Sequence, residues 1–293
     1  YRVFQEASGR QAEEFVARED NKGRTQAAEA DIEWAKWAAA QVRALRKLDF
    51  QVADRSVARV LVELYNAQLL QAGLCVVGTL AYIAWLNELG VKVAVAQTQD
   101  LDFGTHHDLK LATSKPFLDI MQRTKLGFNP VPGLSPGETA SSVKLPGAHG
   151  LRVDVLTSGD ETGQRRSLPA LDWAAQTVEH YDYLLGETRA AAVLAGTHCI
   201  PARLPAVERF VWHKFFSSIV RRNFPEKAAK DREQALLLSA VLCDRDEDQL
   251  LESAQELPES LRDVLIAKRE VLLLSAQVHK GVARMLSQAL GTA

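Results

Sequence analysis

Two aspartates stand where the chain can gather negative charge around a divalent cation. Asp100 and Asp102 alternate with Leu101 and Phe103, so a strand at this point directs both carboxylates to one face and both apolar side chains into the core. Two carboxylates about 7 Å apart along one strand face suit magnesium, which binds carboxylate oxygens together with substrate phosphates. For an isolated Asp-Leu-Asp, the alternative is a solvated strand end.

A third aspartate follows in the segment LRVDVLT, residues 151–157. Asp154 shares a strand face with Arg152, whereas Val153 and Val155 are directed to the opposite, buried face. The alternation is typical of a half-buried strand, so we expect Asp154 to lie on a strand near the acidic pair.

A Gly78-Thr79 turn follows the apolar run LCVV. Glycine permits a tight turn, and a helix beginning near Leu80 directs its free N–H groups and positive dipole end outward, where they can hold phosphate. Many strand-to-helix turns contain glycine for packing alone, so the pair gains meaning from the aspartates. Three acids on neighbouring strands beside such a turn compose a two-metal phosphoryl-transfer site.

These motifs resemble those of the polymerase-β-type nucleotidyltransferase superfamily. The matching pieces are GT at 78–79, TQDLDF at 98–103 and RVDVLT at 152–157. More narrowly, GTLAYIAW and TQDLDF are similar to a bacterial nucleotidyltransferase-fold family related to the toxin-type abortive-infection nucleotidyltransferases. The resemblance covers roughly residues 74–240.

The resemblance implies a magnesium-dependent enzyme, able to use manganese instead, that transfers an NMP from an NTP to an acceptor and releases pyrophosphate. It implies that Gly78 and Thr79 hold the β- and γ-phosphates. It also implies that Asp100 and Asp102 ligate two magnesium ions, while Asp154 completes the metal on the nucleophile side and helps to deprotonate the acceptor.

Further roles are implied for Lys214 and for the pair Lys230-Asp231, which are expected to contact nucleotide phosphates and brace the site. All three lie in residues 201–232, where eight Lys/Arg stand against three Asp/Glu. This segment is either a solvated helix face or a basic wall that receives a triphosphate or a polyanionic acceptor.

The acceptor stays open among an RNA end, a protein hydroxyl and a small metabolite. A second function class also stays open, because a fold does not by itself determine function. In that alternative the chain is a nucleotidyltransferase-fold module that binds nucleotide or serves an antitoxin-linked regulatory role without turnover. The presence of all three acids favours the enzyme.

The patterns of apolar residues along the sequence predict an α+β fold, with a small mixed β-sheet nucleotidyltransferase core between helical parts. Apolar spacings of three and four predict helices at 28–49 and 56–72, within an N-terminal helical segment 1–72, and the charged stretch 18–26 breaks the pattern. Short β-branched runs, LCVV, VKVAVAQ and LRVDVL, predict an α/β core at 73–168. From 169 to 293 we expect a helical bundle in which strands largely vanish.

Composition limits the function classes. The 293 residues carry a net charge of −2 with pI near 6.4, so the chain as a whole does not attract nucleic acid or anionic membrane. Cys75, Cys199 and Cys243 lack metal-site or disulfide spacing, which favours a reducing cytoplasm. The longest mostly apolar run, residues 74–86, is too short to span a bilayer, so we expect no membrane contact.

Other polar and aromatic candidates have ordinary explanations. The consecutive residues His106, His107 and Asp108 converge poorly on one metal ion, so a solvated loop is favoured. His149 lies between Gly147 and Gly150, so we expect it to be a turn residue. The five tryptophans do not cluster along the chain, which favours core and helix contacts over a base-stacking platform.

Overall fold

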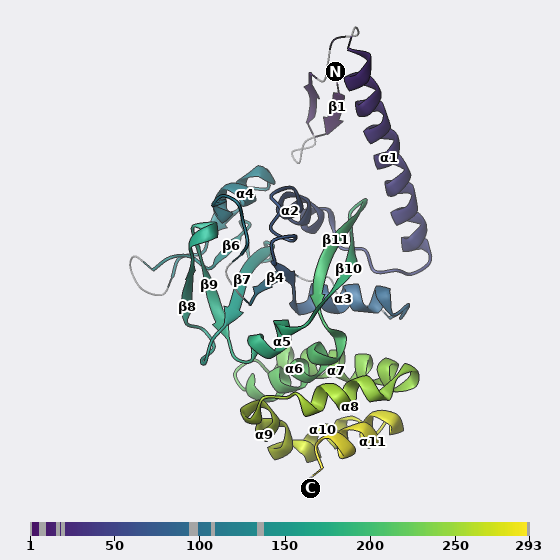
Figure 1. Ribbon diagram of the computed structural model, residues 1–293, viewed down its shortest axis with the longest axis vertical. Coiled ribbons are helices and arrows are strands. Elements are labelled where there is room, and N and C mark those ends of the chain that lie inside the picture. The colour runs from purple at the N-terminus through teal and green to yellow at the C-terminus, as the bar shows by residue number, and fades with distance from the viewer. Residues whose placement is uncertain are drawn as a thin grey trace.

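The chain folds into an α+β protein, as predicted. The structure is a computed structural model, and it describes residues 2–5, 10–15, 18, 21–93, 99–106, 109–133 and 138–291. Figure 1 shows a β-hairpin and a long helix at the N-terminal end, a sheet in the middle and a helical bundle at the C-terminal end. Within the described residues, no helix combines the length and the apolar character needed to cross a bilayer.

The elements are labelled in chain order. The helices are α1 (Lys22–Lys47), α2 (Arg55–Asn66), α3 (Gly78–Glu88), α4 (Phe117–Arg123), α5 (Tyr181–Gly186), α6 (Val207–Val220), α7 (Pro225–Arg245), α8 (Glu247–Gln255), α9 (Glu259–Ala267), α10 (Arg269–Ser275) and α11 (Lys280–Ala289), with a 3₁₀ turn at Pro169–Leu171. The strands are β1 (Arg2–Gln5), β2 (Gln11–Glu14), β3 (Cys75–Val76), β4 (Asp100–Thr105), β5 (Asn129–Pro130), β6 (Ser142–Lys144), β7 (Arg152–Ser158), β8 (Arg165–Leu168), β9 (Trp173–Val178), β10 (Thr188–Ala195) and β11 (His198–Pro205).

The main sheet is mixed, with β7 at its centre. Its strand order is β3-β4-β7-β6-β5, and β9 joins β7 and pairs with β8. β7 runs parallel to β4 and β9 but antiparallel to β6. Two strands share the second edge of β7, because β6 pairs with its first half and β9 with its last three residues. The parallel pair β4–β7 carries the predicted acidic residues.

Helix α3 is buried on every side. Leu80 to Leu86 are all buried, which is the pattern expected of a helix enclosed by other elements rather than lying on a surface. The hairpin β10–β11 covers it: the Trp85 indole N–H donates to the Pro205 carbonyl over 3.1 Å. Helix α3 thus packs between this hairpin and β4.

Helix α6 is the central helix of the C-terminal bundle. It is buried from Val207 to Ser218 apart from Arg209, and the indole N–H of its Trp212 donates to the Leu250 carbonyl of α8 over 3.1 Å. Figure 1 shows the α6–α7 pair between the sheet and the outer helices α8 to α11. Helices α6 and α7 therefore present their near sides to the strands that carry the aspartates.

Several predicted boundaries need correction. The prediction that strands largely vanish after Pro169 is wrong for residues 173–205, where β9 extends the main sheet and β10–β11 form a hairpin. Helix α1 begins at Lys22, inside the stretch expected to break it, because the Asn21 side chain accepts a hydrogen bond from the Arg24 N–H over 3.3 Å and caps the helix.

Two further expectations differ in detail. Helix α2 ends at Asn66 rather than near residue 72, because Gln68 takes a positive φ of 64° that no α-helix accommodates. Of the predicted strand 91–97, residues 91–93 are irregular, and 94–97 lie outside the described residues. The predicted domain limits at 72/73 and 168/169 stay predictions.

Candidate active site

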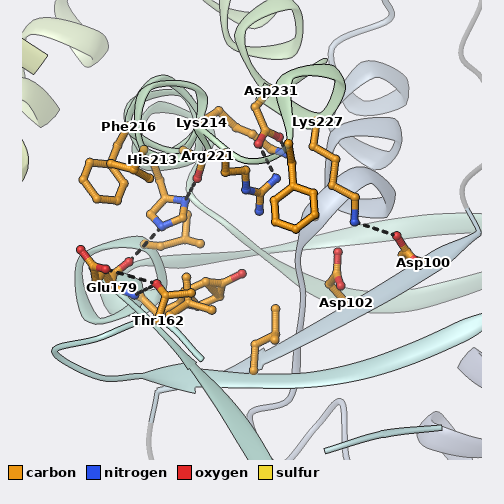
Figure 2. Close-up of a pocket in the computed structure, with 18 of the residues that line it drawn as sticks. Asp100, Asp102, Thr162, Glu179, His213, Lys214, Phe216, Arg221, Lys227 and Asp231 are labelled. Carbon is orange, nitrogen blue, oxygen red and sulfur yellow. Dashed lines mark hydrogen bonds and ion pairs between the residues drawn. The ribbon is translucent and has the colours of Figure 1, made fainter. Parts of the chain in front are cut away.

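The three predicted acidic residues lie on two paired strands. The parallel register of β4 and β7 places Asp102 opposite Asp154. Burial alternates over residues 100–103 of β4 and along all of β7, with Leu101 and Phe103 fully in the core, so the predicted two-faced arrangement is confirmed for these residues. Neighbouring strands lie about 4.8 Å apart, which brings the two carboxylates onto adjacent positions of one face. Figure 2 shows Asp100 and Asp102 together on this face, opposite side chains from the helices.

The Gly78 turn is packed directly against Asp102. The Val77 N–H donates to the Asp102 carbonyl over 3.0 Å, and Gly78 follows with a φ of 62°. A Cβ at Gly78 would lie 2.2 Å from Asp102 Oδ2, so only glycine allows this close approach. Among the described side chains none caps the start of α3, and Gly78 and Thr79 line the cavity at that point. Its first N–H groups are thus available to an anion.

Asp102 occupies an environment that favours a bound cation. Burial raises the pKa of its carboxyl group, and the charges of Asp154 and Asp100 raise it further, to about 6, against the opposing effect of Lys214 and Arg221. The same three carboxylates would be relieved of mutual repulsion by a positive ion placed between them.

Asp154 is held by two neighbours that the sequence patterns did not single out as a pair. Its Oδ1 accepts hydrogen bonds from the Ser142 hydroxyl and from Arg152 Nε, the latter over 2.9 Å. Arg152 Nη2 also donates to Ser142 Oγ over 2.7 Å. Ser142 reaches Asp154 because β6 and β7 pair them directly across the sheet. This arrangement fixes one oxygen and the orientation of the carboxylate.

Asp100 is more exposed than Asp154, with 45% of its side chain accessible against 13%. The Lys227 ammonium, at the start of α7, lies 3.5 Å from Asp100 Oδ2. Figure 2 shows this ion pair crossing the cleft from helix to strand. An exposed pair of this kind contributes at most about 1 kcal/mol, so a ligand can displace it at small cost.

On the helical side, Asp231 holds two cations. Its Oδ1 lies 2.5 Å from Lys214 Nζ, and its Oδ2 lies 2.5 Å from Arg221 Nη1. Only 4% of the Asp231 side chain is accessible, so both oxygens serve these ion pairs rather than a ligand. Lys214 Nζ also lies 5.3 Å above the Phe210 ring. Asp231 therefore links Lys214 of α6 and Arg221 to helix α7.

All eight residues singled out from the sequence line one cavity of about 770 Å³. This volume is typical of sites that enclose a whole small-molecule ligand. The structure brings together residues from β4, β7, α3, α6 and α7, which are separated by up to 153 positions in the chain. The eight are Gly78, Thr79, Asp100, Asp102, Asp154, Lys214, Lys230 and Asp231.

The cavity also contains polar residues that the sequence analysis did not find. His213 Nε2 lies 3.2 Å from the Glu179 carbonyl, which can only accept, so Nε2 carries the proton. Burial lowers the pKa of His213 to about 4, with the nearby charges of Lys214 and Arg221 acting in the same direction. Figure 2 shows His213 and Glu179 at the end of the cavity away from the aspartates. A histidine in the middle of an apolar helix gives no sequence signal for this position.

The other described candidates, His106, His149 and the three cysteines, do not line the cavity. His149 is an exposed residue in a turn, as predicted. His106 follows the end of β4, while His107 and Asp108 lie outside the described residues. Cys75, Cys199 and Cys243 are free thiols.

The carboxylates do not form a closed cage for a metal. In the described part of the chain, no three His, Cys, Asp or Glu side chains are gathered tightly enough to enclose an ion. Magnesium, however, is usually held by one or two carboxylates together with water and substrate phosphates. An all-oxygen set on one strand face, open to a large cavity, fits that mode of binding.

Comparison with known proteins gives one family. A family model described as nucleotidyltransferase matches residues 55–258, which is more than half of the chain. No curated protein matches the chain. The matched span contains every residue that lines the cavity. The chain therefore belongs to this nucleotidyltransferase family.

Proposed function

We propose that the chain is a divalent-metal-dependent nucleotidyltransferase that transfers an NMP from an NTP to an acceptor and releases pyrophosphate. One observation carries the proposal: Asp102 and Asp154 stand opposite each other on parallel strands, against the Gly78 turn, in a cavity shared with Lys214 and Lys230. Acidic oxygens, free helix N–H groups and lysines are the groups that phosphoryl transfer requires.

Both sides of the cavity contribute to binding the NTP. The N–H groups at Gly78 and Thr79 hold the β- and γ-phosphates, because a helix N-terminus binds anions. Lys214 and Lys230 add positive charge from the helical side. Partial burial lowers the pKa of Lys230, and the charge of Lys214 lowers it further. A bound phosphate would act in the opposite direction.

In the reaction, an acceptor oxygen attacks the α-phosphorus in line. A new bond forms between that oxygen and phosphorus, the bond from the α-phosphorus to the bridging oxygen breaks, and pyrophosphate leaves with the bonding electrons. Asp154 accepts the proton of the acceptor and passes it to solvent. Asp100, Asp102 and Asp154 would hold magnesium or manganese, which supplies positive charge to the attacking and leaving oxygens.

The acceptor class is an RNA end, a protein hydroxyl or a small metabolite. We also infer a relation to the toxin-type abortive-infection nucleotidyltransferases, supported by Lys214 and by the adjacent Lys230-Asp231 in the helical layer. The three free thiols are compatible with action in the reducing cytoplasm.

The test is transfer of label from each α-labelled NTP, with magnesium or manganese, into a cell extract. We expect Asp102→Asn to lower transfer about a hundred-fold or more, because it removes a charge that stabilises the transition state. Asp263→Asn, on the exposed surface of α9, is the matched control and should transfer normally.

Two results would contradict the proposal. If Asp102→Asn transfers as well as the wild type, the acidic pair has no part in the chemistry. If NTP binds but no molecule becomes labelled with any nucleotide, the chain is the binding or regulatory module instead.

A further inference from the structure

Phe224 exposes its ring at the rim of the cavity. It lies in the short loop between α6 and α7, and 61% of the residue is accessible. The backbone on either side is fixed: the Phe224 N–H donates to the Arg221 carbonyl over 3.2 Å, and its own carbonyl accepts from the Ala228 N–H over 2.9 Å. The ring is therefore presented to solvent from a held backbone rather than from a loose loop.

An exposed apolar residue is ordinary when it stands alone. Phe224 does not, because Val220, one helical turn earlier in the chain, is 44% exposed and lines the same rim. Of the large exposed apolar residues in the described chain, only these two line the cavity. The other apolar lining residues are buried or half-buried. The rim thus carries a small apolar shelf beside a polar cleft.

The shelf lies next to cationic residues that line the same cavity. Lys227, three positions after Phe224 at the start of α7, reaches Asp100 across the cleft. Side chains three positions apart at a helix start lie on neighbouring parts of one face. Arg221 and Arg222 precede Phe224 by three and two positions, and both line the cavity. A ligand with an anionic part and a flat apolar part matches this arrangement.

We propose that Phe224, backed by Val220, is the stacking platform for the nucleobase of the NTP. The inference rests on the proposed function, in which the phosphates occupy the cleft between the aspartates and the lysines. Every base has a π-face, and stacking on an aromatic ring discriminates little between bases. The platform contributes to NTP affinity and leaves the choice of base to other contacts.

The test compares two ligands in the presence of magnesium, in calorimetric titrations without acceptor. One is α,β-methylene-ATP, in which the bond that breaks is blocked, and the other is inorganic tripolyphosphate, which has no base. We expect Phe224→Ala to weaken α,β-methylene-ATP binding by roughly fivefold to a hundredfold, the range of base–aromatic stacking, and to leave tripolyphosphate binding unchanged. Phe224→Trp should restore the affinity, since the indole also stacks.

Trp34→Ala is the matched control, because Trp34 is an exposed aromatic residue of α1 outside the cavity. It should change neither affinity. If Phe224→Ala loses the same affinity for both ligands, or loses none for either, Phe224 is not the stacking platform. The proposed function would stand in that case, because the wild type still binds the nucleotide. Unchanged nucleotide affinity with weaker binding of a single-stranded oligonucleotide would assign the ring to the acceptor instead. If the wild type binds neither triphosphate, the proposed function and the platform both fail.

Discussion

The replacement Gly78→Ala tests whether the turn before α3 positions the Asp102 carboxylate. The new Cβ would lie 2.2 Å from Asp102 Oδ2 and 3.0 Å from its Cγ, whereas ordinary contacts begin near 3.4 Å. The carboxylate must therefore retreat by about 1 Å or more. A misplacement of about 1 Å can cost roughly a hundredfold in rate. We expect transfer from α-labelled NTP to fall by about that factor.

Alanine at position 78 also carries a backbone cost, which must be separated from the clash. A φ of 62° costs a non-glycine residue about 1–2 kcal/mol. Gly90 provides the control, because it has a φ of 64° just after the same helix and no atom within 4 Å of an added Cβ. Gly90→Ala and Gly78→Ala should each lower the melting temperature by at least roughly 2–8 °C, but only Gly90→Ala should keep its activity.

The reasoning fails if the two variants behave alike. Equal loss of transfer in both would mean that backbone strain in α3, rather than the position of Asp102, controls activity. Full transfer in Gly78→Ala would mean that the Asp102 carboxylate has no required position. Melting curves should be recorded on the same samples, to check that each variant is folded at the assay temperature.

Two further predictions concern helices α6 and α7. Asp231→Asn should destabilise the fold by roughly 3–5 kcal/mol, because it leaves Lys214 unpaired in a buried site. Glu33→Gln, in the exposed pair with Lys36, is the control and should leave the free energy of unfolding nearly unchanged. Weaker NTP binding at unchanged stability would instead make Asp231 a ligand contact. The lowered pKa of His213, about 4, predicts stability that is complete above pH 6.5 and is lost as the pH falls toward 4, since the unfolded chain binds the proton first. Between pH 7 and 5 the wild type should lose about 2 kcal/mol more than His213→Gln in denaturant titrations, and identical pH profiles would exclude this effect.

The acidic half of the site could be predicted because it rests on local patterns. Alternation of apolar and acidic residues determined the faces of β4 and β7, since side chains of a strand alternate strictly. The Gly78 turn was found by its position between an apolar strand and a helix. Its positive φ and its contact with Asp102 depend on the pairing of β3 with β4, which no local pattern shows.

The strands after Pro169 were missed because their residues have weak preferences. TRAAAVLA in β10 and WAAQTV in β9 are rich in alanine, which favours helices in isolation. Their partners decide their structure: β9 adds to the edge of β7, and β10 pairs with β11 over α3. Strand formation depends strongly on such neighbours. Ser142 was missed for the same reason, because only the β6–β7 register brings it to Asp154.

The basic segment 201–232 shows how charge counts mislead when contacts are unknown. Arg203 donates to Thr188, and Arg209 pairs with Glu256, so neither lines the cavity. Lys214 and Arg221 line it, but Asp231 neutralises part of their charge. The segment is thus no continuous basic wall, and its remaining cavity cations are Arg222, Lys227 and Lys230. A few cations opposite three carboxylates match one triphosphate with its metals better than a long polyanion, so recognition of an extended RNA acceptor would require cations from outside this segment.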